Sequence, residues 1–339
     1  MNNQLIMLAD ALLSCRGQAG SVFLYPHVSV DGDAIGSALA LLLALEQLEI
    51  KARLPLDERI PPKLDFLPAL SRIEPYEPSP DADAAGLAGG QQIIGLAIDC
   101  AAADRMGRRG LLFKQAPQIF ALDHHIAQEP VPPEFIVDPS AAAVGELVYD
   151  LIACLGNLTG RTLFNDDIAT LLMAAIISDT GGFVYSNTSI RTFQTAAGLM
   201  GYPLDLRYIT YRLFDRTSQE RLRLMGRVFS EARFSCGDRV VLAAVDQQML
   251  DACRASDYDL DGIIAYLKNV AGVDAAFLIR SQADGLLRVN IRSSERFDAA
   301  AFAARYGGGG HARAAGMHLS GLTLDEAAQK IAQEAGEQL

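Results

Sequence analysis

Short apolar runs alternate with longer helical segments through the first two thirds of the chain. The runs have the length and composition of buried strands and lie at 21–25, 93–98 and 118–122, and a further strand is predicted at 51–56. Segments with the Ala- and Leu-rich composition of buried helices lie at 34–50, 147–155 and 168–177, after a shorter amphipathic helix at 4–15. This alternation indicates a parallel sheet. Residues 61–90 contain six prolines, so we predict loops there with at most one short element.

The pattern changes after a charged helical segment at 217–234. Three further strands are predicted beyond it, at 239–245, 273–280 and 286–292. In the last of these, every second residue is apolar and the residues between them are polar, which is typical of a strand with one buried face. The polar positions are Arg288, Asn290 and Arg292. A short helix and a glycine run at 307–310 follow.

Together these elements predict an α/β protein with two domains. We expect a parallel-sheet domain over residues 1–212, a connecting helix over 213–234 and a smaller α+β domain over 235–339. The length of 339 residues agrees with two domains of ordinary size, and a hydrophobic fraction of 50% suffices for two packed cores.

Charge limits the kind of partner. The chain has 29 Lys and Arg against 41 Asp and Glu, which gives a net charge of -12. A general grip on long duplex nucleic acid needs a broad basic surface, so we expect none, whereas a few local arginines could still hold a small anion. Neither a Walker A motif nor a GxGxxG motif occurs. The five cysteines form no CxxC pair, so no structural zinc site is indicated.

Nothing in the sequence indicates export or membrane insertion. No apolar run approaches the roughly 18 residues that a membrane-spanning helix needs. The first residues, MNNQLIMLADALL, lack the basic region and the cleavage site of a secretory signal. We therefore expect a cytoplasmic protein without a membrane partner.

Polar side chains gather where the predicted strands end. The first set is His27, Asp31 and Asp33, and later strands are followed by Asp99, His124 and His125. Ligands of open parallel sheets bind outside the carboxyl ends of the strands, so one fold would bring these side chains to one edge. Four of the five histidines lie beside Asp or Gly clusters, which is unusual for histidines placed at random.

The turn after the first strand carries the clearest chemical signal. It holds an imidazole at His27 and two carboxylates at Asp31 and Asp33. The carboxylates repel each other, and a divalent cation would offset that repulsion. The alternative is an aspartate that only caps the following helix. A cap accounts for one aspartate and leaves His27 and the other aspartate without a role.

Aspartate and histidine ligands without thiolates suit Mn²⁺ or another divalent ion. The candidate ligands exceed what one ion needs, so we expect two ions that share a bridging carboxylate. Two such ions can activate a water and stabilise the attacking and leaving oxygens of a phosphoryl transfer. Acyl transfer is disfavoured because no G-x-S-x-G motif occurs.

These motifs resemble those of the DHH phosphoesterase superfamily. The resemblance lies in HVSVDGDAIGS at 27–37, Asp99 at a strand end, DHH at 123–125 and SDTGGF at 178–183. GGGGHARAAG at 307–316 is similar to the GGGH signature of the DHHA1 domain, which accompanies one branch of the superfamily. Within that branch the chain most resembles the bacterial bifunctional oligoribonucleases, or nanoRNases, that also dephosphorylate 3'-phosphoadenosine 5'-phosphate (pAp).

The resemblance implies two Mn²⁺ ions, or other divalent ions, on the first domain. The first ion would be held by His27, Asp31 and Asp99. The second would be held by Asp33, Asp99, His124 and Asp179, which makes Asp99 the bridge.

The resemblance makes Asp99 and His125 the catalytic residues. His125 would face the substrate phosphate or steady the site, and Asp123 would orient a neighbouring histidine. The alternative for Asp99 is a plain turn cap. One departure from the family is visible: Ala142-Ala143-Val144 stands where hydroxyl residues are common, which removes groups that could contact the substrate.

The resemblance also implies substrate-binding residues on the second domain, namely Arg292, Ser293, Gly309, Gly310 and His311. Glycines let backbone N–H groups approach a phosphate closely, and arginine supplies a bidentate charged group. The alternatives are a flexible glycine turn and a solvated arginine at a strand edge. His318 has no motif partner, so we expect it to be structural.

The implied function is a Mn²⁺-dependent phosphoesterase of the exonuclease type that uses a water activated by two metal ions. It would hydrolyse short oligoribonucleotides to mononucleotides and remove a phosphate from pAp. The alternatives are a phosphodiesterase for cyclic dinucleotides such as c-di-AMP, or for linear pApA, and a catalytically silent nucleotide sensor. A sensor tends to lack a metal carboxylate, and here all are present. Whether the protein forms a homodimer stays open.

Overall fold

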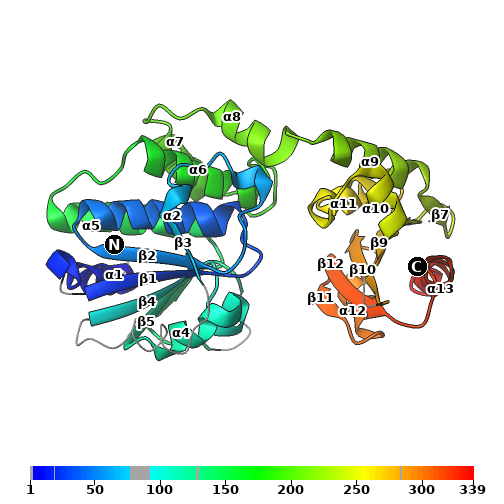
Figure 1. The fold of residues 1–339 in the computed structure, drawn as a ribbon, viewed down its shortest axis with the longest axis horizontal. Helices are drawn as coiled ribbons and strands as arrows, with labels where there is room; N and C mark the ends of the chain where they lie inside the picture. The colour runs from blue at the N-terminus through cyan, green and yellow to red at the C-terminus, as the bar shows by residue number, and fades with distance from the viewer. Residues whose placement is uncertain (1–2, 19, 77–91, 127–129, 283–284) are drawn as a thin grey trace. The chain divides into compact units, whose positions relative to one another are not determined.

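In the computed structural model, which describes residues 3–18, 20–76, 92–126, 130–282 and 285–339, the chain forms two units, Met1–Arg216 and Thr217–Leu339 (Figure 1). Each unit contains one six-stranded sheet. The sheet of the first unit is parallel, and that of the smaller second unit is mixed. The predicted α/β class is therefore confirmed.

The strands of the first sheet lie in the order β3-β2-β1-β4-β5-β6. Their bounds are β1 Gly20–Pro26, β2 Lys51–Leu56, β3 Ile73–Pro75, β4 Gln92–Ile98, β5 Gln118–Asp123 and β6 Phe135–Val137. The four predicted strands are confirmed as β1, β2, β4 and β5. The order reverses between β1 and β4, so the carboxyl ends of these two strands flank the point where open α/β sheets bind ligands.

Helices cover both faces of this sheet. One face is covered by α1 Asn3–Leu13, α2 Gly32–Gln47 and α5 Val144–Thr159 (Figure 1). Helix α6 Asp166–Thr180 packs on α2 and α5, and α7 Ile190–Leu199 packs on α6. The other face carries a 3₁₀ segment, Ala103–Arg109, and α4 Gly110–Gln115. Helices α2 and α6 cross closely at Gly36, where an added Cβ would lie 2.6 Å from the carbonyl oxygen of Leu171.

The region predicted as loops contains more structure than expected. Two short 3₁₀ turns, Pro62–Leu64 and Leu70–Arg72, precede β3 at the edge of the sheet. Residues 77–90 of that predicted loop region lie outside the described residues. The first unit ends with α8 Leu206–Thr210 and a π-helical turn, Tyr211–Asp215.

The second sheet has the order β11-β12-β10-β9-β8-β7. The bounds are β7 Arg233–Ser235, β8 Val240–Val245, β9 Ala275–Ser281, β10 Leu287–Ser293, β11 Gly309–His311 and β12 Ala314–Leu319. Helices α9 Gln219–Ser230, α10 Gln247–Cys253 and α11 Ile263–Lys268 pack on one face, and α12 Ala299–Ala304 and α13 Leu324–Gly336 pack on the other.

The segment predicted as a single connecting helix, 213–234, is not one helix. The π-helical turn ends at Asp215, Arg216 is extended, and α9 begins at Gln219. Leu224 and Val228 of α9 pack into a core of the second unit, so this helix belongs to that unit. Among the residues that the structure describes, no helix is long and apolar enough to cross a bilayer.

Candidate active site

The structure brings together the six side chains that the sequence suggested as metal ligands. They form two groups, His27 with Asp31 and Asp99, and Asp33 with His124 and Asp179. Within each group the nearest ligand atoms all lie within 4.8 Å of one another. The residues come from the carboxyl ends of β1, β4 and β5 and from the ends of α2 and α6, so five separate segments meet at the point where the strand order reverses.

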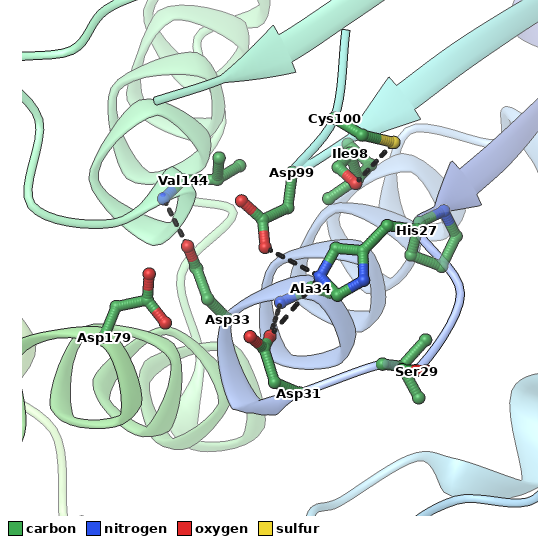
Figure 2. A network of polar contacts seen from close by, with 12 residues as sticks. His27, Ser29, Asp31, Asp33, Ala34, Ile98, Asp99, Cys100, Val144 and Asp179 are labelled. Carbon is green, nitrogen blue, oxygen red and sulfur yellow. Dashed lines mark hydrogen bonds and ion pairs between the residues drawn. The ribbon is translucent and has the colours of Figure 1, made fainter. Parts of the chain in front are cut away.

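Asp99 lies between the two groups. Its Oδ2 is 3.2 Å from Nε2 of His27, and its Oδ1 is 3.4 Å from Nε2 of His124. The residue is 1% exposed and has a φ of 61°, an uncommon backbone conformation for aspartate. Figure 2 shows its carboxylate directed into the space that the other aspartates surround. Each carboxylate oxygen therefore faces a different histidine, which is the geometry that a bridging ligand requires.

Backbone carbonyls fix the two histidines. Nδ1 of His27 lies 2.7 Å from the carbonyl oxygen of Val28, and Nδ1 of His124 lies 3.2 Å from that of Ala141. A proton on each Nδ1 would be donated to these carbonyls. Nε2 of each ring would then present its lone pair to the aspartates, which is how metal-binding imidazoles are usually oriented.

Asp31 and Asp33 are held at the start of α2 (Figure 2). Oδ1 of Asp31 accepts a hydrogen bond of 3.0 Å from the backbone N–H of Ala34, so this residue is the helix cap that the sequence offered as an alternative. The same oxygen lies 3.9 Å from Nε2 of His27. Capping and membership of the cluster are therefore compatible.

Asp33 is fully buried against the start of another helix. Its carboxylate accepts hydrogen bonds from the backbone N–H groups of Val144 at 2.6 Å and Gly145 at 2.8 Å, and from the hydroxyl of Ser37 at 2.9 Å. The N-terminus of α5 therefore fixes this carboxylate in place and favours its negative charge. Val144, the last residue of the segment 142–144 that departs from the family, supplies one of these backbone donors, and this contact does not depend on the missing hydroxyl groups.

The carboxylates create a local excess of negative charge. Burial and the neighbouring carboxylate of Asp99 raise the pKa of Asp33 well above its ordinary value. Burial alone would also raise the pKa of Asp99, but contacts with His124 and His27 lower it to about 2. Burial alone would lower the pKa of His124, but contacts with Asp179 and Asp99 raise it to about 11. The site therefore favours positive charge, as a proton or as a cation.

Two buried atoms at the centre fit a cation. Oδ1 of Asp99 and Nε2 of His124 face each other at 3.4 Å, and neither makes a hydrogen bond of good geometry among the described residues. Leaving buried polar atoms unpaired is costly, so such atoms call for an explanation. Carboxylate oxygens and imidazole nitrogens are ligands that suit Mn²⁺ and similar divalent ions. The residues present therefore fit a pair of divalent cations.

His125 and Asp123 form a pair beside the cluster. Asp123 is 4% exposed, and its Oδ1 lies 2.7 Å from Nδ1 of His125 and accepts a 3.0 Å hydrogen bond from the same residue's N–H. The pair fixes the ring of His125, whose side chain stays 44% exposed. His125 also forms a third possible ligand group with Asp99 and His124.

A buried arginine that the sequence analysis missed holds the first metal-binding turn. Arg109 is fully buried, and its Nη1 donates to the carbonyl oxygen of Pro26 at 3.0 Å while its Nε donates to Asp57 at 2.9 Å. The neighbouring Glu58 accepts from the N–H of Ser29 at 3.0 Å. No pattern pointed to these residues, because their partners lie far away in the sequence.

A second missed arginine supports the segment that leads into α5. Arg191 pairs with Asp138 at 2.7 Å, Asp150 at 2.8 Å and the buried Glu146 at 3.4 Å. The N-terminus of α5 binds Asp33, so Arg191 stabilises the position of that metal-ligand candidate without contacting it. The sequence alone does not show whether an arginine is paired with carboxylates or exposed to solvent, so Arg191 could not be predicted.

The candidate substrate residues of the second unit fall on two faces of its sheet. Arg292 on β10 and His311 on β11 are both in register with Ala314 of β12, the strand between them. Their side chains therefore share a face of the sheet. Ser293 points the other way, is buried, and donates its hydroxyl to the carbonyl oxygen of Ala312 at 3.0 Å. The structure therefore groups Arg292 with His311 and separates Ser293 from them.

The glycine run is part of the sheet. Gly309 and Gly310 form β11 with His311, so the flexible-turn alternative is wrong for these residues. Gly310 has a φ of 141°, and an added Cβ would lie 2.5 Å from the carbonyl oxygen of Ala314, so only glycine fits. Gly309 has open space where a side chain would be.

Comparison with known proteins agrees with both units. The family model described as the DHH family, N-terminal domain, matches residues 21–176, and the DHHA1 domain matches residues 244–337. A bifunctional oligoribonuclease and PAP phosphatase NrnA of Thermus thermophilus is 32% identical over 325 residues, covering 94% of this chain and 90% of that protein. The chain therefore belongs to the DHH family of phosphoesterases, in the branch that carries a DHHA1 domain.

Two further similarities extend this result. A cyclic-di-AMP phosphodiesterase GdpP of Geobacillus thermodenitrificans is 24% identical over 347 residues, covering 96% of this chain and 48% of that protein. The crystal structure of an exopolyphosphatase-related protein from Bacteroides fragilis matches with a TM-score of 0.87 and 23% identity, covering 99% of this chain and 96% of that one. At that identity the match confirms the fold.

Proposed function

We propose that this protein is a Mn²⁺-dependent phosphoesterase that hydrolyses short oligoribonucleotides to mononucleotides and dephosphorylates pAp. The observation that carries the proposal is the position of Asp99, whose two oxygens face two separate groups of ligands. The similarity to a bifunctional oligoribonuclease and PAP phosphatase over most of both chains supports this substrate class.

In this proposal His27, Asp31 and Asp99 hold one ion, and Asp33, Asp99, His124 and Asp179 hold the other. Divalent ions bound there would activate a water and stabilise the charge that develops during phosphoryl transfer. The protein's own part is to fix the ligands before the substrate binds. Asp33 is held by α5, and the histidines are held by backbone carbonyls.

We assign His125 to the substrate phosphate. Its Nδ1–H donates to Asp123, so the protonated form of this partly exposed ring has Nε2–H free to donate to a phosphate oxygen. A donor fixed in this way would stabilise phosphate oxygens as charge builds up on them. This role does not require His125 to bind a metal ion.

Arg292 and His311 are proposed to bind a substrate phosphate, with the backbone of Gly309 and Gly310 beside them. Arg292→Ala and His311→Ala should each lower kcat/KM by about one to two orders of magnitude, because each removes a charge-assisted contact to phosphate. Both residues lie in the second unit, so Mn²⁺ content should be normal.

Metal analysis and steady-state kinetics of these variants check the assignment, with Arg233→Ala at the opposite edge of the sheet as control. A variant that loses its Mn²⁺ would show that Arg292 or His311 supports the metal site instead.

A cyclic-dinucleotide phosphodiesterase is the second candidate. It is favoured by the similarity to a cyclic-di-AMP phosphodiesterase that covers nearly the whole of this chain. The ligand groups described above would serve either reaction, because both cleave phosphate esters of adenine nucleotides. A silent sensor is disfavoured, since all the carboxylates of the two groups are present.

One assay separates the candidates. The purified protein with Mn²⁺ is offered pAp, a 5'-labelled series of RNA dimers to pentamers, and c-di-AMP in parallel. We expect the highest kcat/KM for the short RNAs and for pAp. Faster cleavage of c-di-AMP than of either would favour the second candidate, and no cleavage of any of them would contradict both.

We further propose that the protein acts in the cytoplasm. Its proposed partners are short oligoribonucleotides, pAp and cyclic or linear dinucleotides. A homodimer is compatible with this function, and sedimentation of the purified chain would test it.

A further inference from the structure

One face of the second sheet carries polar residues beyond those assigned to the substrate. In β10 and β12 every second residue is buried in the core beneath α12 and α13, and the residues between them lie on the opposite face. That opposite face is called the polar face here. Its members are Arg288, Asn290, Arg292, Ala314, Gly316 and His318, together with Gly309 and His311 of β11.

The strand register arranges these residues in three rows. Arg292, Ala314 and His311 form the first row, and Asn290, Gly316 and Gly309 form the second. The third row pairs Arg288 directly with His318. Residues opposite one another in neighbouring antiparallel strands lie side by side. The polar face therefore has a cationic group at each end and small residues with one amide between them.

The middle of the polar face is open. An added Cβ at Gly309 would meet no atom within 4 Å, and one at Gly316 would meet only the carbonyl oxygen of Val289 at 3.7 Å. Helix α11 contacts β10 and packs over β9, so it borders the polar face on that side. A ligand could therefore lie along β10 and β12 against bare backbone.

The positive charge of Arg288 in the third row is uncompensated. Arg288 and His318 are exposed, and neither forms an ion pair within the described residues. The neighbouring Arg280 on β9 differs, because Asp257 pairs with it. In a chain with a net charge of -12, a patch with cationic groups and no carboxylate partner is a local exception that would attract anions.

We infer that Arg288 and His318 form a subsite for a second backbone phosphate of a short oligonucleotide, with Asn290 and the open glycines beneath the nucleotide between them. The inference rests on the proposed function, in which Arg292 and His311 bind the first phosphate. Arg288 and Arg292 are four residues apart on one strand, which is about 14 Å along it. A single phosphate would have to draw both side chains together over the middle row, whereas two successive phosphates together with the reach of the two arginine side chains can span the three rows.

This subsite would set a preference among substrates. A dinucleotide has one backbone phosphate and would reach the first row alone. A trinucleotide has two and would also engage Arg288 and His318. pAp, with a single nucleoside, would gain nothing from the third row. In this proposal His318 contacts the substrate instead of serving the structural role expected from the sequence, which agrees with its exposure and its register with Arg288.

The test is direct binding to the Mn²⁺-loaded full chain. Oligoadenylates of two, three and four nucleotides with phosphorothioate links, which resist hydrolysis, are titrated by calorimetry at several salt concentrations. In the wild type we expect the trinucleotide to bind more tightly than the dinucleotide. Arg288→Gln should lower the ratio of trinucleotide to dinucleotide affinity about tenfold. It should also reduce the salt slope for the trinucleotide by about 0.7, as expected for one lost phosphate contact.

Two further variants sharpen the test. His318→Gln should act in the same direction, with a smaller loss. Arg233→Gln removes the same charge from β7 at the opposite edge of the sheet and should match the wild type. Equal losses for dinucleotide and trinucleotide, or wild-type behaviour of Arg288→Gln, would overturn the subsite and leave the proposed function standing. A wild-type protein that binds none of these ligands would overturn both.

Discussion

Asp99→Asn should lower kcat for pAp or short RNA by at least about a thousandfold. The substitution keeps the shape of the side chain and removes the charge that faces both ligand groups, with His27 3.2 Å from one oxygen and His124 3.4 Å from the other. Losing several kcal/mol of charge stabilisation corresponds to such a factor, since each 1.36 kcal/mol is about tenfold in rate. Affinity for both metal ions should fall together.

The fold of this variant should survive. Asparagine keeps the shape of the side chain, but it loses the charge that His27 and His124 stabilise, so the unfolding midpoint of the metal-free protein should fall moderately without loss of the fold. Asp104→Asn is the matched control, because Asp104 is exposed and follows the same strand. Calorimetric titration with Mn²⁺ and steady-state rates check both statements. Two ions bound with wild-type affinity would rule out the bridging role.

Arg109→Ala should lower the free energy of unfolding of the first unit by about 3–5 kcal/mol. Truncating a large, fully buried side chain usually costs this much, because a cavity is left and buried partners of the side chain stay unpaired. Here the substitution leaves the Asp57 carboxylate and the carbonyl of Pro26 without their donor, and it opens a cavity where a fully buried side chain was.

The neighbouring Arg108 offers a matched control, since it is exposed and carries the same charge. Arg108→Ala should change stability by less than about 0.5 kcal/mol. Urea denaturation followed by circular dichroism measures both variants. If Arg109→Ala were no less stable than Arg108→Ala, the buried arginine would not be holding the turn that carries His27.

The parts of the fold that the sequence predicted are those with long patterns. Strands β1, β2, β4 and β5 have six or seven residues each, whereas β3, β6, β7 and β11 have three residues each and offer no periodicity. Helix α13 was missed although it has a readable signal, because Thr323 and Glu326 form a capping box at its start.

The candidate site was predictable to the extent that its residues follow strand ends. His27 and Asp99 stand directly after β1 and β4, and topology alone brings such positions together. Arg109 and Arg191 follow no such rule. Their partners are carbonyl oxygens and carboxylates on segments that only the fold places beside them. Likewise, only the strand register shows that His318 lies opposite Arg288.

The most direct test of the two-metal account is a titration of metal-free protein with Mn²⁺, in which bound ions and the rate of pAp hydrolysis are measured together. The account predicts two ions per chain, with hydrolysis appearing only as the second ion binds, and both ions weakened by Asp99→Asn. Full activity with one bound ion per chain, or hydrolysis by metal-free protein, would contradict it.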